Sequence, residues 1–139
     1  MTVLLALDVG DKRVGIAMAG AGSSMATPHS TVERAAGRAE REILALIKQH
    51  KIERMVVGLP LSDDGQKNEQ CLKVERFCRR LQKRVQVDIQ FVDEYASSYE
   101  AEEKLRSAGV SGRQLKKDGF LDAASAAVIL QSFLDAQRT

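Results

Sequence analysis

The stretch "LLALDVGDKRVGIAMA", residues 4–19, decides how this chain folds. Its first apolar run lacks alternation, which is typical of a strand buried on both faces. Gly10 and Asp11 then favour a turn, and the second apolar run predicts a returning strand over 13–19. Asp8 is out of place in the first strand, because an unpaired buried charge costs several kcal/mol. The charge of Asp8 must therefore be compensated by a partner, or Asp8 must open onto a functional site.

Strands and helices alternate along the rest of the chain. A third strand is predicted over 26–33, where Pro28 favours a sheet edge, and further strands over 53–58 and 85–94. Helices are predicted over 36–50 and 68–84, from the capping box at Ser97 to Gly109, and over 119–136. The first two helices have these apolar stripes: Ala39, Ile43, Leu46 and Ile47; Cys71, Val74, Cys78, Leu81 and Val85. This order predicts an α/β fold: a mixed sheet that begins with three antiparallel strands and has helices on its faces.

Length and composition fit one soluble globular domain over residues 1–139. The net charge of +2 permits a nucleic-acid partner without demanding one. There is no apolar run of roughly 18 residues and no signal-peptide pattern, so we expect no membrane contact and a cytoplasmic location. Cys71 and Cys78 would lie about 10 Å apart on one helix. A disulfide needs Cα atoms within about 7 Å, so both are expected to be buried, reduced thiols.

Three acidic positions are awkward in a purely structural interpretation. Asp8 ends the first strand, Asp93 and Glu94 end the last strand, and Asp122 shares a helix face with Ala126, Ile129 and Phe133. If they converge, the carboxylates would repel one another unless a hard cation such as Mg²⁺ or Mn²⁺ bound them. Two such ions ~3.5–4 Å apart hydrolyse phosphodiesters. The alternatives are a turn cap at Asp8, a plain strand-end acid at Asp93 and a helix N-cap at Asp122.

Four segments resemble the YqgF-like, or RuvX, family of RNase H-fold nucleases. "ALDVGDKRVGIAM" resembles its D-x-G-x-K-x-x-G signature, and "VVGLPLSDDG" resembles its second motif. "FVDEYASSYEAE" resembles D-E-R-x-[ST]-[ST]-x-x-A, and "FLDAASAAVILQSFLD" is similar to the closing helix. The four motifs come in the family's order and cover nearly the whole chain.

The resemblance implies a ribonuclease H-like fold with a central mixed five-stranded sheet. It implies that Asp8, Glu94 and Asp122 are the metal-binding catalytic acids, which selects Glu94 over Asp93. It also implies a metal-dependent endonuclease, using Mg²⁺ or Mn²⁺ and expected to hold two ions. The substrate it implies is structured nucleic acid, foremost precursor ribosomal RNA processed at the 5′ end of 16S rRNA.

The chain departs from the family pattern in two places. Tyr95 replaces the arginine of the D-E-R motif, and Phe120 replaces a lysine two residues before the last acid. An arginine would bind phosphate with two hydrogen bonds, whereas a tyrosine can stack on a base. The expected nucleic-acid contacts are Lys12, Arg13, Tyr95, Arg113, Lys116 and Lys117. Arg76, Arg80 and Lys83, opposite the apolar stripe of the second helix, form either a further nucleic-acid surface or a solvated face.

Two other functions compete with this one. A Holliday junction resolvase would cut branched DNA as a homodimer, because symmetric cleavage of a junction needs two active sites. A non-catalytic nucleic-acid-binding module would fit the replacements at Tyr95 and Phe120. The first hairpin also resembles the phosphate-binding hairpin of actin-like ATPases, but those proteins close two such domains around a nucleotide.

Overall fold

A five-stranded mixed sheet forms the centre of the protein. The computed structural model describes residues 3–62, 64–93, 103, 106–107 and 121–137. The strands are β1 (Leu4–Val9), β2 (Arg13–Ala19), β3 (Thr27–Glu33), β4 (Arg54–Leu59) and β5 (Asp88–Asp93), in the order β3-β2-β1-β4-β5. The β1–β2 and β2–β3 pairs are antiparallel, and the β1–β4 and β4–β5 pairs are parallel. The predicted mixed sheet is confirmed, with the strand that contains Pro28 at an edge.

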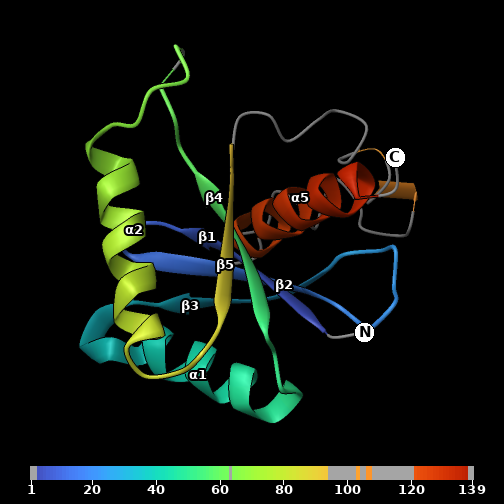
Figure 1. The fold of residues 1–139 in the computed structure, drawn as a ribbon, viewed down its shortest axis with the longest axis horizontal. Helices are drawn as coiled ribbons and strands as arrows, with labels where there is room; N and C mark the ends of the chain where they lie inside the picture. The colour runs from blue at the N-terminus through green and yellow to red at the C-terminus, as the bar shows by residue number, and fades with distance from the viewer. Residues whose placement is uncertain (1–2, 63, 94–102, 104–105, 108–120, 138–139) are drawn as a thin grey trace.

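Helices cover both faces of this sheet (Figure 1). A short 3-10 turn, η1 (Ala35–Gly37), leads into α1 (Arg38–His50), and α2 (Glu69–Gln82) follows β4. These two helices pack on one face and α5 (Leu121–Ala136) packs on the other. The helix predicted from Ser97 to Gly109 lies mostly outside the described residues.

The core on the α1 and α2 side follows the predicted apolar stripes except at Val85, which lies beyond α2 and is only partly buried. These stripe residues are buried: Ala39, Ile43, Leu46, Ile47, Cys71, Val74, Cys78 and Leu81. Phe77 is fully buried as well, which the stripe did not include. Both cysteines are free and buried, so the prediction of reduced thiols is confirmed.

Small side chains line the interface between α5 and the sheet. Ala6, Ala17 and Ala19 of the sheet face Ala126 and Ala127 of the helix, and all are buried. Small residues let a helix axis lie close to a sheet, as they do between helices. This close packing fixes where the first turn of α5 meets β1 and β2.

Several element boundaries differ from the sequence-based expectation by one to three residues, and two of them have a clear cause. The predicted stop at Gly58 is wrong: β4 continues to Leu59, because Gly58 pairs with Val92 and Leu59 with Asp93. The last strand begins at Asp88 rather than at Val85, since the Val85 N–H still bonds the Leu81 carbonyl at the end of α2.

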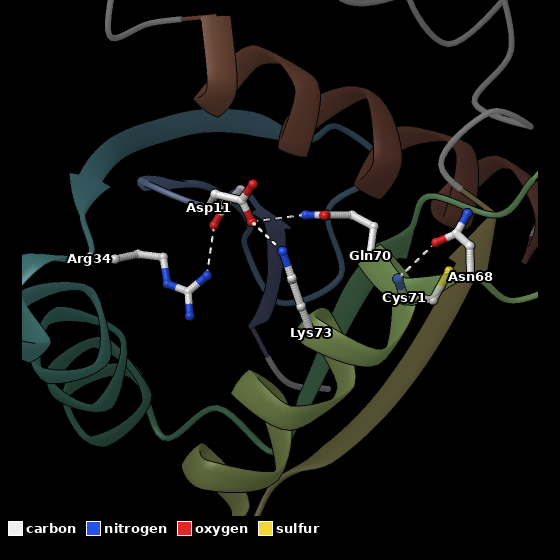
Figure 2. Close-up of polar contacts among 7 residues, drawn as sticks. Asp11, Arg34, Asn68, Gln70, Cys71 and Lys73 are labelled. Atoms are coloured by element: carbon white, nitrogen blue, oxygen red, sulfur yellow. Dashed lines mark hydrogen bonds and ion pairs between the residues drawn. The ribbon is translucent and has the colours of Figure 1, made fainter.

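The start of α2 is tied to the end of β4. The Asn68 side chain accepts a hydrogen bond from the Cys71 N–H at 3.0 Å and so caps the helix. Its amide nitrogen donates to the Pro60 carbonyl at 2.8 Å. The first turn of α2 is thereby placed beside the turn between β1 and β2 (Figure 2). None of the helices in the described part of the chain could span a membrane.

Candidate active site

Asp8 lies on the α5 face of the sheet. Its neighbours Leu7 and Val9 are buried in the core beneath α1 and α2, and strand side chains alternate between faces. Ala6, two residues before it, packs under α5. Asp8 is only partly buried, although the residues on either side of it are buried. The acid is tolerated in this strand because its position opens toward solvent on the α5 side.

Gly15 brings the first turn of α5 next to Asp8. It is the direct cross-strand partner of Asp8 in the β1–β2 ladder. A Cβ atom built on Gly15 would overlap the backbone carbonyl of Asp122 and would lie 2.8 Å from the Ala123 nitrogen. The backbone of Asp122 therefore sits directly on Gly15. Because cross-strand neighbours are about 5 Å apart, Asp8 and Asp122 come from distant parts of the chain to one small area.

Asp122 is inside the first turn of α5 rather than before it, so the alternative of a helix N-cap is wrong. The side chain is 32% exposed, and its Oδ2 lies 3.4 Å from Nε of Arg13. Arg13 begins β2 two residues before Gly15, so strand alternation places it on the same face. A cation already lies beside this carboxylate.

Asp93 lies on the opposite face from Asp8. Ile89 and Phe91 pack against the core beneath α1 and α2, whereas Val92 packs beneath α5. The residue after Val92 in this strand thus returns to the α1 and α2 face. Asp93 therefore does not join Asp8 and Asp122. Glu94 lies outside the described residues, and within the described ranges no group of three or more metal-ligating side chains is found.

The turn between β1 and β2, residues 10–12, is held from two sides (Figure 2). Nη1 of Arg34 donates to the Gly10 carbonyl at 2.8 Å, and its guanidinium lies 4.9 Å from the ring centroid of Phe77. From α2, the Gln70 amide donates to Asp11 at 3.2 Å, and Nζ of Lys73 is 3.8 Å from the same oxygen. These contacts fix the turn that follows Asp8.

A pocket of about 590 Å³ adjoins this turn. Its lining residues are Asp11, Lys12, Arg13, Glu33, Arg34 and Ala35. Lys12 and Arg13 therefore border open space at the turn after β1, and Arg13 also pairs with Asp122. A second pocket, beside Lys48 and Arg84, lies where β4 begins and away from Asp8 and Asp122. Because it holds no carboxylate pair, we assign it no part in the site.

The remaining predicted site residues lie outside the described part of the chain. These are Tyr95, Arg113, Lys116 and Lys117, together with the departure at Phe120. Their roles stay predictions from the sequence.

Two structural residues of the site were missed by the sequence analysis. Gly15 had a signal, since a glycine inside a strand often marks a close backbone approach. Arg34 had none, because its contact with Gly10 depends on how β3 returns beside the turn.

Comparison with known families identifies a match over almost the whole chain. A family model described as "RuvX: Holliday junction resolvase" matches residues 2–136. A protein of Nitratidesulfovibrio vulgaris named "Putative pre-16S rRNA nuclease" is 41% identical over 132 residues, which are 94% of this chain and 92% of that protein. A protein of the same name from Trichormus variabilis is 40% identical over 97% of this chain and 89% of its own length.

Solved structures share the fold at much lower identity. RuvC of T. thermophilus in complex with a Holliday junction substrate has a TM-score of 0.66 at 14% identity, over 99% of this chain and 96% of that one. The fowlpox virus resolvase, solved with Holliday junction DNA, has a TM-score of 0.59 at 12% identity, with 99% of each chain covered. The expected ribonuclease H-like fold is confirmed, and at this identity the likeness concerns the fold alone.

Proposed function

Because the chain belongs to the RuvX family of nucleases, we propose that it is a metal-dependent endonuclease that processes the 5′ end of precursor 16S ribosomal RNA. The name of its relatives at about 40% identity supports this substrate. We further propose that residues 1–139 form one nuclease domain that works in the cytoplasm.

The observation that carries the proposal is the meeting of Asp8 and Asp122 across Gly15. The two acids are 114 positions apart in the sequence, and the sheet and α5 bring them to one face. An acid in a buried strand and an acid in a packed helix turn have no structural need for each other. Their juxtaposition supports a catalytic site at the end of β1.

The residues fit a hard divalent cation. Asp8 and Asp122 would supply carboxylate oxygens, which Mg²⁺ and Mn²⁺ prefer. The Asp122 carboxylate already pairs with a positive charge, since Nε of Arg13 lies 3.4 Å from its Oδ2. We propose Glu94 as the third acidic ligand, because the family resemblance implies it and Asp93 faces away. Two such ions, when bound, would activate a water and stabilise the leaving oxygen of a phosphodiester.

The chain's own cations would hold the substrate. We propose that Lys12 and Arg13 contact phosphate oxygens next to the scissile bond, since both border the pocket at the turn after β1 and Arg13 lies beside Asp122. The planar fork of Arg13 suits bidentate phosphate binding. Arg34 and Asp11 keep the turn in place and so position Lys12. Tyr95, Arg113, Lys116 and Lys117 are proposed as further contacts on sequence grounds alone.

A cleavage assay with two substrates tests the proposal. Purified protein would be given an RNA fragment spanning the 5′ end of 16S rRNA in its precursor, and separately a DNA four-way junction. Each reaction would contain Mg²⁺, Mn²⁺ or a chelator. The proposal predicts metal-dependent cleavage of the RNA near the mature end. Failure to cut the RNA under any of these conditions would contradict it.

The second candidate function is junction resolution, which the description of the matching family model favours. It predicts symmetric cuts in the four-way junction and a homodimer in solution. Light scattering at assay concentration separates the two functions, because a strict monomer that cuts RNA would exclude the resolvase. Nucleic-acid binding without cleavage would instead indicate a binding module.

A further inference from the structure

The positive charge of this protein is concentrated on α2. Residues 69–84, which are α2 and the two basic residues after it, carry a net charge of +4, whereas the rest of the chain sums to −2. Five basic residues of α2 and its C-cap, which we call the α2 stripe, are exposed: Lys73, Arg76, Arg79, Arg80 and Lys83. They recur at intervals of three and four residues, so they share the outward side of the helix. The buried side of the same helix holds the apolar residues.

In the part of the chain that the structure describes, neighbouring acids pair with only two of the five stripe cations, Lys73 and Arg80. The α2 acid Glu75 is engaged by Lys67 at 3.0 Å, outside the stripe. Arg80 is tied to Glu40 at 3.6 Å and lies 5.7 Å from the Phe77 ring centroid, which makes it partly structural. Within the described residues, Arg76, Arg79 and Lys83 have no ion pair. Three adjacent, exposed, uncompensated cations repel one another, so this surface has an electrostatic cost unless a polyanion meets it.

The stripe begins at the proposed site. Lys73, its first member, reaches Asp11 in the turn that follows Asp8 (Figure 2). From there α2 runs along the sheet away from the site (Figure 1). The eleven residues from Lys73 to the C-cap Lys83 span about 15 Å along the helix axis. A nucleic-acid duplex carries roughly one charge per 1.7 Å of its axis, so a stripe of this length meets several phosphates.

We infer that the α2 stripe is a second contact surface for the substrate, which binds the phosphate backbone of an RNA segment flanking the cleaved bond. This inference rests on the proposed function, from which it takes RNA as the substrate. A nucleic acid fits better than an acidic protein, because the cations form a regular row continuous with the turn beside the site. Backbone contacts of this kind position a substrate and carry no sequence information.

The test measures binding without cleavage. The full chain would be titrated in chelator against a fluorescent RNA spanning the 5′ end of precursor 16S rRNA, at several KCl concentrations. The variant is Arg76→Ala with Lys83→Ala, because alanine preserves an exposed helix. We expect affinity to fall about tenfold or more at low salt. The slope of log K against log salt should fall by roughly 1.5, as for two lost phosphate contacts.

The matched control removes two exposed cations from α1, through Arg38→Ala with Lys48→Ala. It loses the same charge from another helix, so it should keep the wild-type slope. An unchanged slope in the α2 variant would overturn the inference, as would an equal loss in the control. An acidic protein partner on the stripe would also leave RNA binding unchanged.

The two proposals fail separately. If RNA binding depends on the α2 stripe but no cleavage occurs in Mg²⁺ or Mn²⁺, the nuclease proposal is wrong and the RNA contact on α2 is supported. If metal-dependent RNA cleavage occurs but binding does not depend on the α2 stripe, the RNA contact on α2 is wrong and the nuclease proposal is supported.

Discussion

Gly15 determines how close α5 lies to β2 and therefore where Asp122 is relative to Asp8. No side chain fits between the strand and the Asp122 backbone. The constraint is one of space, since α5 cannot move away without opening the alanine-lined interface with the sheet. A single hydrogen atom in place of a methyl group thus sets the geometry of the proposed site.

Gly15→Ala should destabilise the protein and impair cleavage together. Overpacking of a tight interface costs about 1–3 kcal/mol, and the first turn of α5 would have to shift with Asp122. Urea unfolding and the RNA cleavage rate measure the two effects. Gly20→Ala is the control, because a Cβ atom at Gly20 meets nothing within 4 Å. A stable, fully active Gly15→Ala protein would refute the close approach.

Cys78 should be an inert thiol. Burial raises its pKa from 9.0 to about 12, and the nearby charge of Glu75 adds to the effect. In the unfolded chain the thiol ionises at its ordinary pKa, so stability should fall as the pH rises from about 9 toward 12. Between pH 8 and 10 the loss is about 1 kcal/mol.

Urea unfolding of wild type and Cys78→Ala at pH 8 and pH 10 checks this prediction. The wild type should lose more stability than the variant over that interval. Equal pH dependence, or rapid reaction of the native thiol with a disulfide reagent at pH 8, would show that the site is not buried as described.

Among the elements, the sequence predicted those whose pattern is local. The apolar stripes of α1 and α2 are periodic, and the edge position of β3 follows from Pro28, so both were found. Gly58 was misread as a strand end, because its pairing with Val92 comes from a strand 30 residues further on. Asp8 and Asp122 were found from their awkward chemistry, while Gly15 and Arg34 depend on neighbours that only the folded chain supplies.

Gln131 fastens α5 to the segment before β3. The side chain is fully buried, accepts from the Ala26 N–H at 3.0 Å and donates to the Ser24 carbonyl at 2.9 Å. Its amide nitrogen also lies 3.1 Å from Asp135. The buried amide therefore makes hydrogen bonds through both its oxygen and its nitrogen. Removing it would leave the Ala26 N–H and the Ser24 carbonyl without these partners.

Gln131→Ala should lower the free energy of unfolding by about 1–3 kcal/mol, because it strands buried backbone groups. Chemical denaturation gives this value directly. Gln49→Ala, at an exposed position of α1, should change it little. Equal effects of the two substitutions would mean that Gln131 does not fasten the helix.

In the whole molecule, the two faces of the sheet have different tasks. The α5 face is packed with small residues and brings two acids together. The α1 and α2 face holds the larger core. The exposed side of α2 on this face is basic. Both faces meet at the turn after β1, where Arg34, Gln70 and Lys73 hold the chain beside Asp8. We therefore propose that cleavage and substrate binding occur on adjoining faces at one end of the sheet.

The most direct test of this account is the single-turnover rate of precursor 16S rRNA cleavage in Mn²⁺ for wild type and Asp8→Asn. Asp88→Asn serves as the control, since it removes the same charge from an exposed position at the start of β5. We expect Asp8→Asn to lose at least about a hundredfold in rate, or about 2.7 kcal/mol of transition-state stabilisation, while Asp88→Asn cleaves like the wild type. Cleavage by Asp8→Asn at the wild-type rate would contradict the assignment of the site.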